Sequence, residues 1–394
     1  MAEVPADEWD ALTLPCDRPL LSWGFLSLLE ASGSMTSETG WIPSHALARE
    51  NGVLVAAASF YIKTHSWGEF VFDFELAELA ERLGKAWYPK LVGMVPATPA
   101  PAWRVLVRPE ARGTNEELVL SRLLIESASE AAREAGLGGL HILWPEPETA
   151  SRLAASPDFI AWEHQSFLWT DSGYGDFAGY LDSFSKNMRR NVRREREAIA
   201  AAGIETRMID AKEAASHPAI LETMAELYEL HNDKFGPWAA RFLEPDFFLR
   251  LPEFLPDDGW LLSAAFDRGS SLENGDEPVA LAFLLAGEER LYGRFWGYKR
   301  EVPGLHFELC YYQPIEYALE HGIASFDPGM GSPHKARRGF ASRSTPSFHL
   351  VFDRKLASIM KNALPSANAE ERAQIDALNE DLPFKKNQAG ERTL

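Results

Sequence analysis

The chain has 394 residues, of which 46% are hydrophobic and 25% charged, and its formal net charge is −19 at pH 7. This length predicts two domains, and this composition is typical of a globular protein and not of a disordered one. A charge this negative argues against broad non-specific binding to nucleic acid or to anionic membranes, so we expect no DNA partner.

The sequence shows no pattern of export or of membrane insertion. Its longest apolar stretch, residues 53–62, is far shorter than the ~20 residues needed to span a bilayer. The N-terminus is acidic and lacks the apolar segment of a secretory signal. The two cysteines, Cys16 and Cys310, cannot make a disulfide framework and lack metal-site spacing. We therefore expect a cytoplasmic protein with no membrane span and no bound metal.

Helices and strands are predicted to alternate after a loose lead-in over residues 1–19. The predicted elements of the first half are a helix at 20–31, a strand at 53–63, a helix at 76–83, a strand at 103–107, a helix at 116–135, and strands at 140–144 and 167–170. The segment 171–176 contains two glycines among polar and acidic residues and is the best candidate for a domain boundary. The first domain is therefore predicted over residues 20–172.

The second half repeats this alternation. Its predicted elements are a helix at 177–202, a strand at 205–209, a helix at 218–235, strands at 260–266, 279–286 and 290–298, a helix at 306–322, and strands at 325–326 and 348–352. The second domain is predicted over residues 173–355, and residues 356–394 form a charged tail, part helix and part disorder. Each domain should be α/β (α+β), a mixed sheet flanked by helices.

One segment of the first domain resembles the acetyl-CoA-binding core of GNAT acetyltransferases. It reads VRPEARGTNEEL from Val107, a strand that enters a loop and then a helix. In that family the loop amides and the helix dipole hold a pyrophosphate. Here Asn115 and Glu117 stand at the two glycine positions if Arg112 opens the motif, and the carboxylate of Glu116 would also repel a diphosphate. The segment therefore fits GNAT scaffold without a working CoA site.

Several longer motifs resemble a bacterial family of N-acyltransferases labelled peptidoglycan biosynthesis/recognition, whose relatives are FemAB-like proteins. The motifs are KTHSWGEFVFD from Lys63, WYPKL from Trp87, KNMRRNVRRER from Lys186, LYGRFWG from Leu291, HFELCYYQPIE from His306 and HKARRGF from His334. The resemblance covers roughly residues 20–355. The family usually has Ala-Gln-Gly-x-His-Lys where this chain has Met330-Gly-Ser-Pro-His-Lys, which puts acceptor choice in question.

This resemblance implies two tandem GNAT-like acyl-CoA N-acyltransferase domains with a cleft between them. It also implies that an acyl group passes from acyl-CoA (acetyl-CoA), a co-substrate and not a permanently bound cofactor, to the amine of a small molecule or peptide. In a first alternative the donor is aminoacyl-tRNA, as in Fem-type ligases. In a second, the chain is a GNAT-fold module that binds a cell-wall precursor or a peptide without chemistry.

The basic segment at residues 186–196 is a candidate phosphate site on a chain that is otherwise acidic. At helical spacing Arg189 and Arg193 share a face, and Arg190 lies beside them. This face could hold a donor phosphate or the end of a tRNA. The alternative is a solvated face whose arginines pair with Glu195 and Glu197.

A second candidate phosphate site follows the strand at 290–298. Lys299 and Arg300 precede Gly304 and the start of a helix, the geometry that holds a pyrophosphate at a helix N-terminus. An ordinary connecting turn is the alternative.

The first turns of that helix carry candidate catalytic groups. An ammonium acceptor must lose a proton, so His306 or Glu308 is a candidate general base. Tyr311 could donate a proton to a departing thiolate, as GNAT tyrosines do. The alternatives are helix capping for Glu308 and aromatic core for Tyr311.

Two further clusters are candidate sites. His334, Lys335 and Arg338 follow a glycine-rich run, which suits an anionic substrate or an oxyanion, so His334 and Lys335 are candidate catalytic residues and Arg338 is a candidate substrate-binding residue; a flexible surface loop is the alternative. The trio of His65, Glu69 and Asp73 lies at four-residue spacing on one side of an extended chain and could bind an acceptor amine. Another interpretation of that trio, which we do not favour, is a metal site.

Overall fold

The computed structural model describes residues 1–236 and 239–385, which divide into two compact units. Unit 1 contains Met1–Gln165, Phe242–Phe247 and Ser344–Gln374. Unit 2 contains Ser166–Arg241, Phe248–Arg343 and the chain from Ile375. The chain passes between the units inside two strands, inside a short helix and the last helix, and once in a loop. The contiguous domains expected at 20–172 and 173–355 therefore differ from these units.

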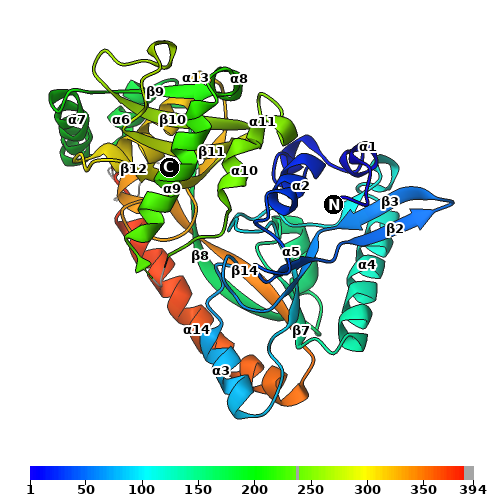
Figure 1. Ribbon diagram of the computed structural model, residues 1–394. Helices are drawn as coiled ribbons and strands as arrows, with labels where there is room; N and C mark the ends of the chain where they lie inside the picture. The colour runs from blue at the N-terminus through cyan, green and yellow to red at the C-terminus, as the bar shows by residue number, and fades with distance from the viewer. Residues whose placement is uncertain (237–238, 386–394) are drawn as a thin grey trace. The chain divides into compact units, whose positions relative to one another are not determined.

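Unit 1 is built on a five-stranded mixed sheet and a smaller antiparallel sheet (Figure 1). The strand order in the larger sheet is β1 (Trp41–Pro43), β4 (Phe60–Lys63), β5 (Lys90–Gly93), β7 (Gly139–Ile142) and β14 (Ala341–Val351). Only β5 and β7 are parallel within it. The smaller sheet has the order β2 (Ala46–Glu50), β3 (Val53–Ala58) and β6 (Leu106–Val107). The single strand predicted at 53–63 is thus β3 and β4, in two different sheets.

The helices of unit 1 pack an aromatic and aliphatic core that includes Phe60, Trp103 and Leu140, all fully buried. Its helices are α1 (Ala6–Asp10), η1 (Pro15–Asp17), α2 (Trp23–Ala31), α3 (Phe74–Arg82), η2 (Pro109–Ala111), α4 (Asn115–Glu134), α5 (Pro147–Ala154) and the first part of α14 (Arg354–Glu380). The lead-in is not loose: the indole of Trp9 is buried and donates to the Leu21 carbonyl at 2.8 Å. The expected tail is largely helix α14, and its residues 386–394 lie outside the described residues.

Unit 2 is built on a six-stranded mixed sheet. The strand order is β8 (Ile160–Thr170), β13 (Ser325–Asp327), β12 (Arg290–Tyr298), β11 (Ala280–Ala286), β10 (Trp260–Asp267) and β9 (Ile204–Asp210). β12 and β13 are parallel, and the other neighbours are antiparallel. Because Gly297 lies directly under α9 (Ala219–Asp233), a Cβ there would come within 2.0 Å of the Leu227 carbonyl oxygen. This close approach seats α9 on β12.

The remaining helices of unit 2 surround this sheet (Figure 1). They are α6 (Phe177–Ser183), α7 (Lys186–Ala201), α8 (Ala211–Ser216), α11 (Leu251–Phe254), η4 (Leu272–Asn274), α12 (Leu305–Phe307), the π-helical turn η5 (Glu308–Tyr312), α13 (Gln313–Glu320) and η6 (Ala336–Arg338). The short helix α10 (Pro245–Leu249) spans a border between the units. Among the described residues, no helix has both the length and the apolar character that crossing a bilayer requires.

Candidate active site

Strand β12 of unit 2 carries a β-bulge at Arg294. Phe283 of β11 pairs with Phe295 and Leu284 pairs with Gly293, so Arg294 has no residue opposite it. A bulge bends its strand and turns a side chain in a new direction, which is why bulges recur beside active sites. The Arg294 side chain is only 3% exposed and lines a cavity.

This cavity has a volume of about 250 Å³ and lies entirely within unit 2. Its walls come from β11, β12, the turn η5 and the loop after β13, and its polar and aromatic lining includes Arg294, Trp296, His306, Cys310, Tyr311 and Lys335. A π-helical turn such as η5 holds one residue more per turn than an α-helix and is often found at functional sites. Three of the sequence motifs, those that begin at Leu291, His306 and His334, therefore meet at one cavity.

Arg294 is only partly hydrogen-bonded. Its Nη1 donates to Oδ1 of Asp327 at 3.1 Å and to the Gly293 carbonyl at 2.8 Å. The same Asp327 oxygen accepts the Gly329 N–H at 2.8 Å, and its side chain is 4% exposed. Nε and Nη2 of Arg294 are buried and have no partner among the described residues. Sequence reasoning missed Arg294, although a charged residue in the middle of a strand, between glycine and aromatic neighbours, was a signal for it.

Lys335 is the second buried cation of the cavity. Its Nζ donates to the carbonyls of Gly329 and Met330 at 2.8 and 2.6 Å, so one of the three ammonium donors remains. Burial lowers the pKa of Lys335 to about 7; Arg294 acts in the same direction and Asp327 opposes it. At neutral pH this amine is therefore close to half protonated.

His306 and Tyr311 supply the groups that can exchange protons. The His306 ring lies 4.6 Å from the Trp296 ring and 5.3 Å from the Tyr311 ring, measured between centroids. Burial, together with Lys335, lowers the pKa of His306 to about 4, so its ring is neutral at pH 7. Burial raises the pKa of Tyr311, which therefore keeps its phenolic proton. Burial also raises the pKa of the Cys310 thiol, which makes it a poor nucleophile.

The structure separates the two candidate bases, His306 and Glu308. The Glu308 carboxylate accepts from Nε of Arg196 at 2.9 Å and does not line the cavity. Two residues along a helix differ by about 200° in direction, so side chains at 306 and 308 point to opposite sides. Glu308 holds α7 in place and is not available as the base.

The loop cluster at 334–338 is also divided by the structure. Lys335 enters the cavity, whereas the exposed His334 does not line it. The Arg338 guanidinium lies 3.2 Å from the centre of the Phe307 ring and donates to Glu195 at 3.0 Å. Arg338 is therefore a brace between the loop and α7, which corrects its predicted role in substrate binding.

Neither predicted pyrophosphate loop presents an open anion site. In unit 2, Lys299 pairs with Glu277 and Arg300 pairs with Asp267, which neutralises both cations. At Gly304, where φ is +85°, the carbonyl already accepts the N–H groups of the first turn at 3.0 and 3.1 Å. This arrangement is that of a connecting turn.

In unit 1 an internal carboxylate fills the loop. Glu117, 5% exposed, accepts the Gly113 N–H at 2.7 Å and the Arg152 guanidinium at 3.2 Å. Arg112 donates to the carbonyls of the lead-in, at 3.0 Å for Leu12 and 3.2 Å for Thr13. The loop amide and the arginines that a pyrophosphate would use already have partners in the protein.

The carboxylates of Glu69 and Asp73 do bind an amine, but it belongs to the protein. Lys90 Nζ lies 2.7 Å from Glu69 and 2.5 Å from Asp73, and all three side chains are at most 1% exposed. Asp73 also accepts the indole N–H of Trp87 at 2.8 Å, while His65 instead bonds to the Thr39 carbonyl at 3.0 Å. Within residues 1–236 and 239–385 no group of His, Cys, Asp or Glu is arranged to hold a metal ion. The trio therefore does not form the acceptor site that its spacing predicts.

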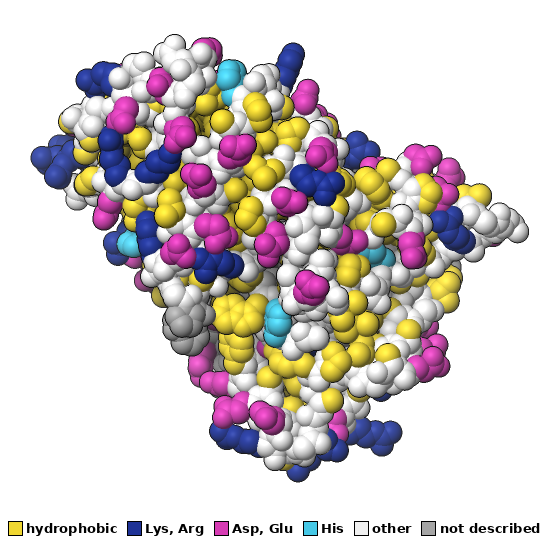
Figure 2. Space-filling model, in the orientation of Figure 1, with side chains coloured by type: hydrophobic (Ala, Val, Ile, Leu, Met, Phe, Trp, Pro, Cys, Tyr) yellow, Lys and Arg dark blue, Asp and Glu magenta, His cyan; other side chains and the backbone are white. Residues whose placement is uncertain are grey.

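The basic face of α7 is exposed and mostly unpaired. Figure 2 shows Lys and Arg side chains gathered where Figure 1 draws this helix. Arg189 pairs with Asp182 at 2.9 Å, whereas Arg190 and Arg193 are exposed and form no ion pair within the described part of the chain. The alternative partner Glu195 is used by Arg338 instead. The face is therefore open to an external polyanion.

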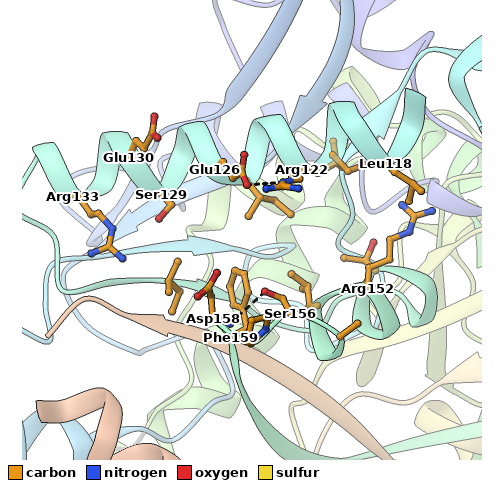
Figure 3. A pocket seen from close by; sticks show the side chains of 18 residues that line it. Leu118, Arg122, Glu126, Ser129, Glu130, Arg133, Arg152, Ser156, Asp158 and Phe159 are labelled. Carbon is orange, nitrogen blue, oxygen red and sulfur yellow. Dashed lines mark hydrogen bonds and ion pairs between the residues drawn. The ribbon is translucent and has the colours of Figure 1, made fainter. Parts of the chain in front are cut away.

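A larger hollow of about 770 Å³ lies in unit 1 between α4 and the segment that follows α5 (Figure 3). Its arginines already have partners: Arg122 pairs with Glu126 at 2.7 Å along the helix, and Arg152 pairs with Glu148. Arg133 lies 3.9 Å from the centre of the Phe352 ring. Without a free buried polar group, this hollow is a weaker candidate than the cavity of unit 2.

Comparisons with known proteins agree with this architecture. A search of curated proteins gives no match. Among solved structures, the chain is similar to the C-terminal DUF2156 domain of a protein named as a lysylphosphatidylglycerol synthetase from Agrobacterium fabrum, with a TM-score of 0.53 and 13% identity over 91% of this chain and 96% of that one. It is also similar to FemX, with a TM-score of 0.52 and 14% identity over 91% of this chain and 98% of that one.

A tandem GNAT protein from the clavulanic acid biosynthesis pathway is similar as well, with a TM-score of 0.41 and 13% identity over 87% of this chain and 93% of that one. The predicted fold class, α/β (α+β) with mixed sheets flanked by helices, is confirmed. The FemAB-like family, described as peptidoglycan biosynthesis/recognition, matches residues 1–386. The chain therefore belongs to the FemAB-like family.

Proposed function

We propose that the protein is an acyltransferase that moves an acyl or aminoacyl group onto an amine in the cavity of unit 2. The observation that carries this proposal is the meeting of four groups in one buried space: the cations Arg294 and Lys335, the neutral His306 and the protonated Tyr311. Acyl transfer needs positive charge at an oxyanion and groups that accept and donate one proton each.

The reaction follows from these positions. The neutral amine of the acceptor attacks the donor carbonyl carbon, and the electron pair of the C=O bond moves to oxygen. The free N–H of Lys335 stabilises that oxyanion. With a pKa of about 4, His306 is a weak base, so it takes the amine proton after the C–N bond has formed, when that proton is far more acidic. The intermediate then collapses, the departing oxygen or sulfur takes a proton from Tyr311, and the proton held by His306 passes to the Tyr311 oxygen, which restores both groups.

Between the two donor classes, we favour aminoacyl-tRNA over acyl-CoA. Both loops predicted for a CoA pyrophosphate are filled or neutralised by the protein's own groups. The face of α7, by contrast, offers unpaired arginines on a chain with a net charge of −19. Such a patch attracts a polyanion by release of its counterions. Given the family's description, we propose a peptidoglycan precursor or a related peptide as the acceptor.

The donor assignment predicts a selective effect on tRNA binding. Changing Arg190 and Arg193 to alanine should weaken binding of tRNA about tenfold and reduce the slope of log K against log salt by about 2, one unit for each phosphate that the variant no longer neutralises. The matched control changes Arg82 and Arg122, which are 71% and 78% exposed and lie in unit 1. Equal effects in the two double variants would assign the weakening to net charge and not to α7. A melting temperature raised by CoA and not by tRNA would reverse the donor assignment.

The chemistry is tested at His306. The change His306→Ala should lower kcat by about 10²–10⁴-fold, the usual contribution of one proton-transfer group. The reduction should shrink with acceptors of low pKa, since the N–H of their tetrahedral intermediate is more acidic and gives up its proton more readily without His306. Glu308→Gln serves as the matched control, because Glu308 lies on the same turn but outside the cavity. A reduction that is equal for acceptors of high and low pKa would make His306 a structural residue.

A further inference from the structure

The structure assigns a second role to the cavity: we infer that Arg294 binds the acceptor through a carboxylate, which makes the acceptor a small amino acid or the equivalent end of a peptide. This inference rests on the proposed function and specifies the substrate class of the same site.

The Arg294 guanidinium uses only some of its hydrogen-bond donors. Its side chain is 3% exposed, yet Nε and Nη2 have no partner among the described residues. A buried N–H without a partner is unfavourable, so such groups normally have an acceptor. Nε and Nη2 lie on the same edge of the guanidinium, and this edge matches the two oxygens of a carboxylate in a bidentate pair. Asp327 engages only the other nitrogen, Nη1, and holds the free edge in place.

The net charge of the site also favours a carboxylate ligand. Arg294 and Lys335 each carry at most one positive charge and Asp327 carries one negative charge, so the net charge of the three groups is at most +1. The cavity can therefore compensate one negative charge but not two. This balance favours a carboxylate over the dianion of a phosphate monoester.

The size of the cavity and the residues that line it also favour a small acceptor. A volume of about 250 Å³ is below the ~300–1,000 Å³ of sites for drug-sized ligands, so a nucleotide or CoA does not fit inside. A small acceptor does fit, and the same cavity contains His306. A carboxylate held by Arg294 thus leaves the amine of the same molecule within the space that His306 lines.

The test compares ligands that differ only in the carboxylate. Binding of L-alanine and of L-alaninamide to the full-length protein is measured by calorimetry, with aminomethylphosphonate and inorganic phosphate as the phosphorus-containing probes. We expect L-alanine to bind, L-alaninamide to bind at least tenfold more weakly, and the phosphorus probes to bind more weakly than L-alanine. Arg294→Lys keeps the positive charge beside Asp327 but removes the pair of donors that Nε and Nη2 form. This variant should bind L-alanine about 10–100-fold more weakly, with little change in melting temperature.

Three outcomes would overturn the inference: equal affinities for L-alanine and L-alaninamide, no binding of either, or tighter binding of a phosphorus probe. If Arg294→Lys fails to fold, the double variant Arg294→Gln with Asp327→Asn serves for the same comparison. Failure of the proposed function is distinguishable. Efficient transfer to amines that lack a carboxylate would retain the acyltransferase and reject the carboxylate site. Arg294-dependent binding of L-alanine, with no transfer from any donor, would reject the acyltransferase and retain the site.

Discussion

Replacing Lys335 with methionine is expected to lower kcat for acyl transfer by about 10²–10³-fold, the usual cost of removing one oxyanion donor. Methionine fills a similar volume, so the cavity should keep its shape. Because the buried ammonium has a lowered pKa, its charged form is unfavourable in the folded state, and its removal should not lower the melting temperature. A variant that retains more than a third of wild-type kcat would remove Lys335 from the mechanism.

The titration of Lys335 predicts that kcat for acyl transfer decreases at high pH. The ammonium form of Lys335 predominates below its pKa of about 7, so oxyanion stabilisation should be lost as the pH rises through 7. In Lys335→Arg the side chain stays charged at all accessible pH values, and this falling limb should disappear even if the absolute rate is lower. A limb that persists unchanged in the arginine variant would belong to another group.

Replacing Lys90 with methionine is expected to lower the free energy of unfolding by about 3–5 kcal/mol, since the change leaves the carboxylates of Glu69 and Asp73 buried without their cation. Urea unfolding followed by tryptophan fluorescence measures this decrease. The matched control is the triple variant Lys90→Met, Glu69→Gln, Asp73→Asn, in which the charges are removed together and most of the stability should return. A single variant as stable as wild type would show that the buried pair contributes nothing.

Sequence patterns predicted most of the secondary structure, because each half alternates apolar periods of the helical and the strand type. They did not predict the borders of the units. Four of the five borders fall inside β8, α10, β14 and α14, where the hydrogen-bonded ladder or helix continues across the border.

The candidate site was predicted in part. His306, Tyr311 and Lys335 could be singled out because they lie in motifs with functional residue types, and they line one cavity. Glu308 was chosen by proximity in sequence, and the phase of the helix sends it to the other side. The ion pair of Asp73 could not be predicted from the sequence, because its partner Lys90 is 17 residues away and only the tertiary fold brings the two together. Long-range pairing of this kind leaves no local pattern.

Two walls of the cavity, β12 and η5, each contain one extra residue relative to regular secondary structure. β12 has one residue more than β11 at Arg294, and η5 has one more per turn than the α-helices on either side of it. Deleting one codon in either segment would restore regular pairing or regular helix and rotate the following side chains away from the cavity. The active-site geometry can thus be gained or lost by single-codon insertions and deletions while the sheet and helices remain. Among relatives, the lengths of these two segments should therefore distinguish members with this chemistry better than the identity of any one residue.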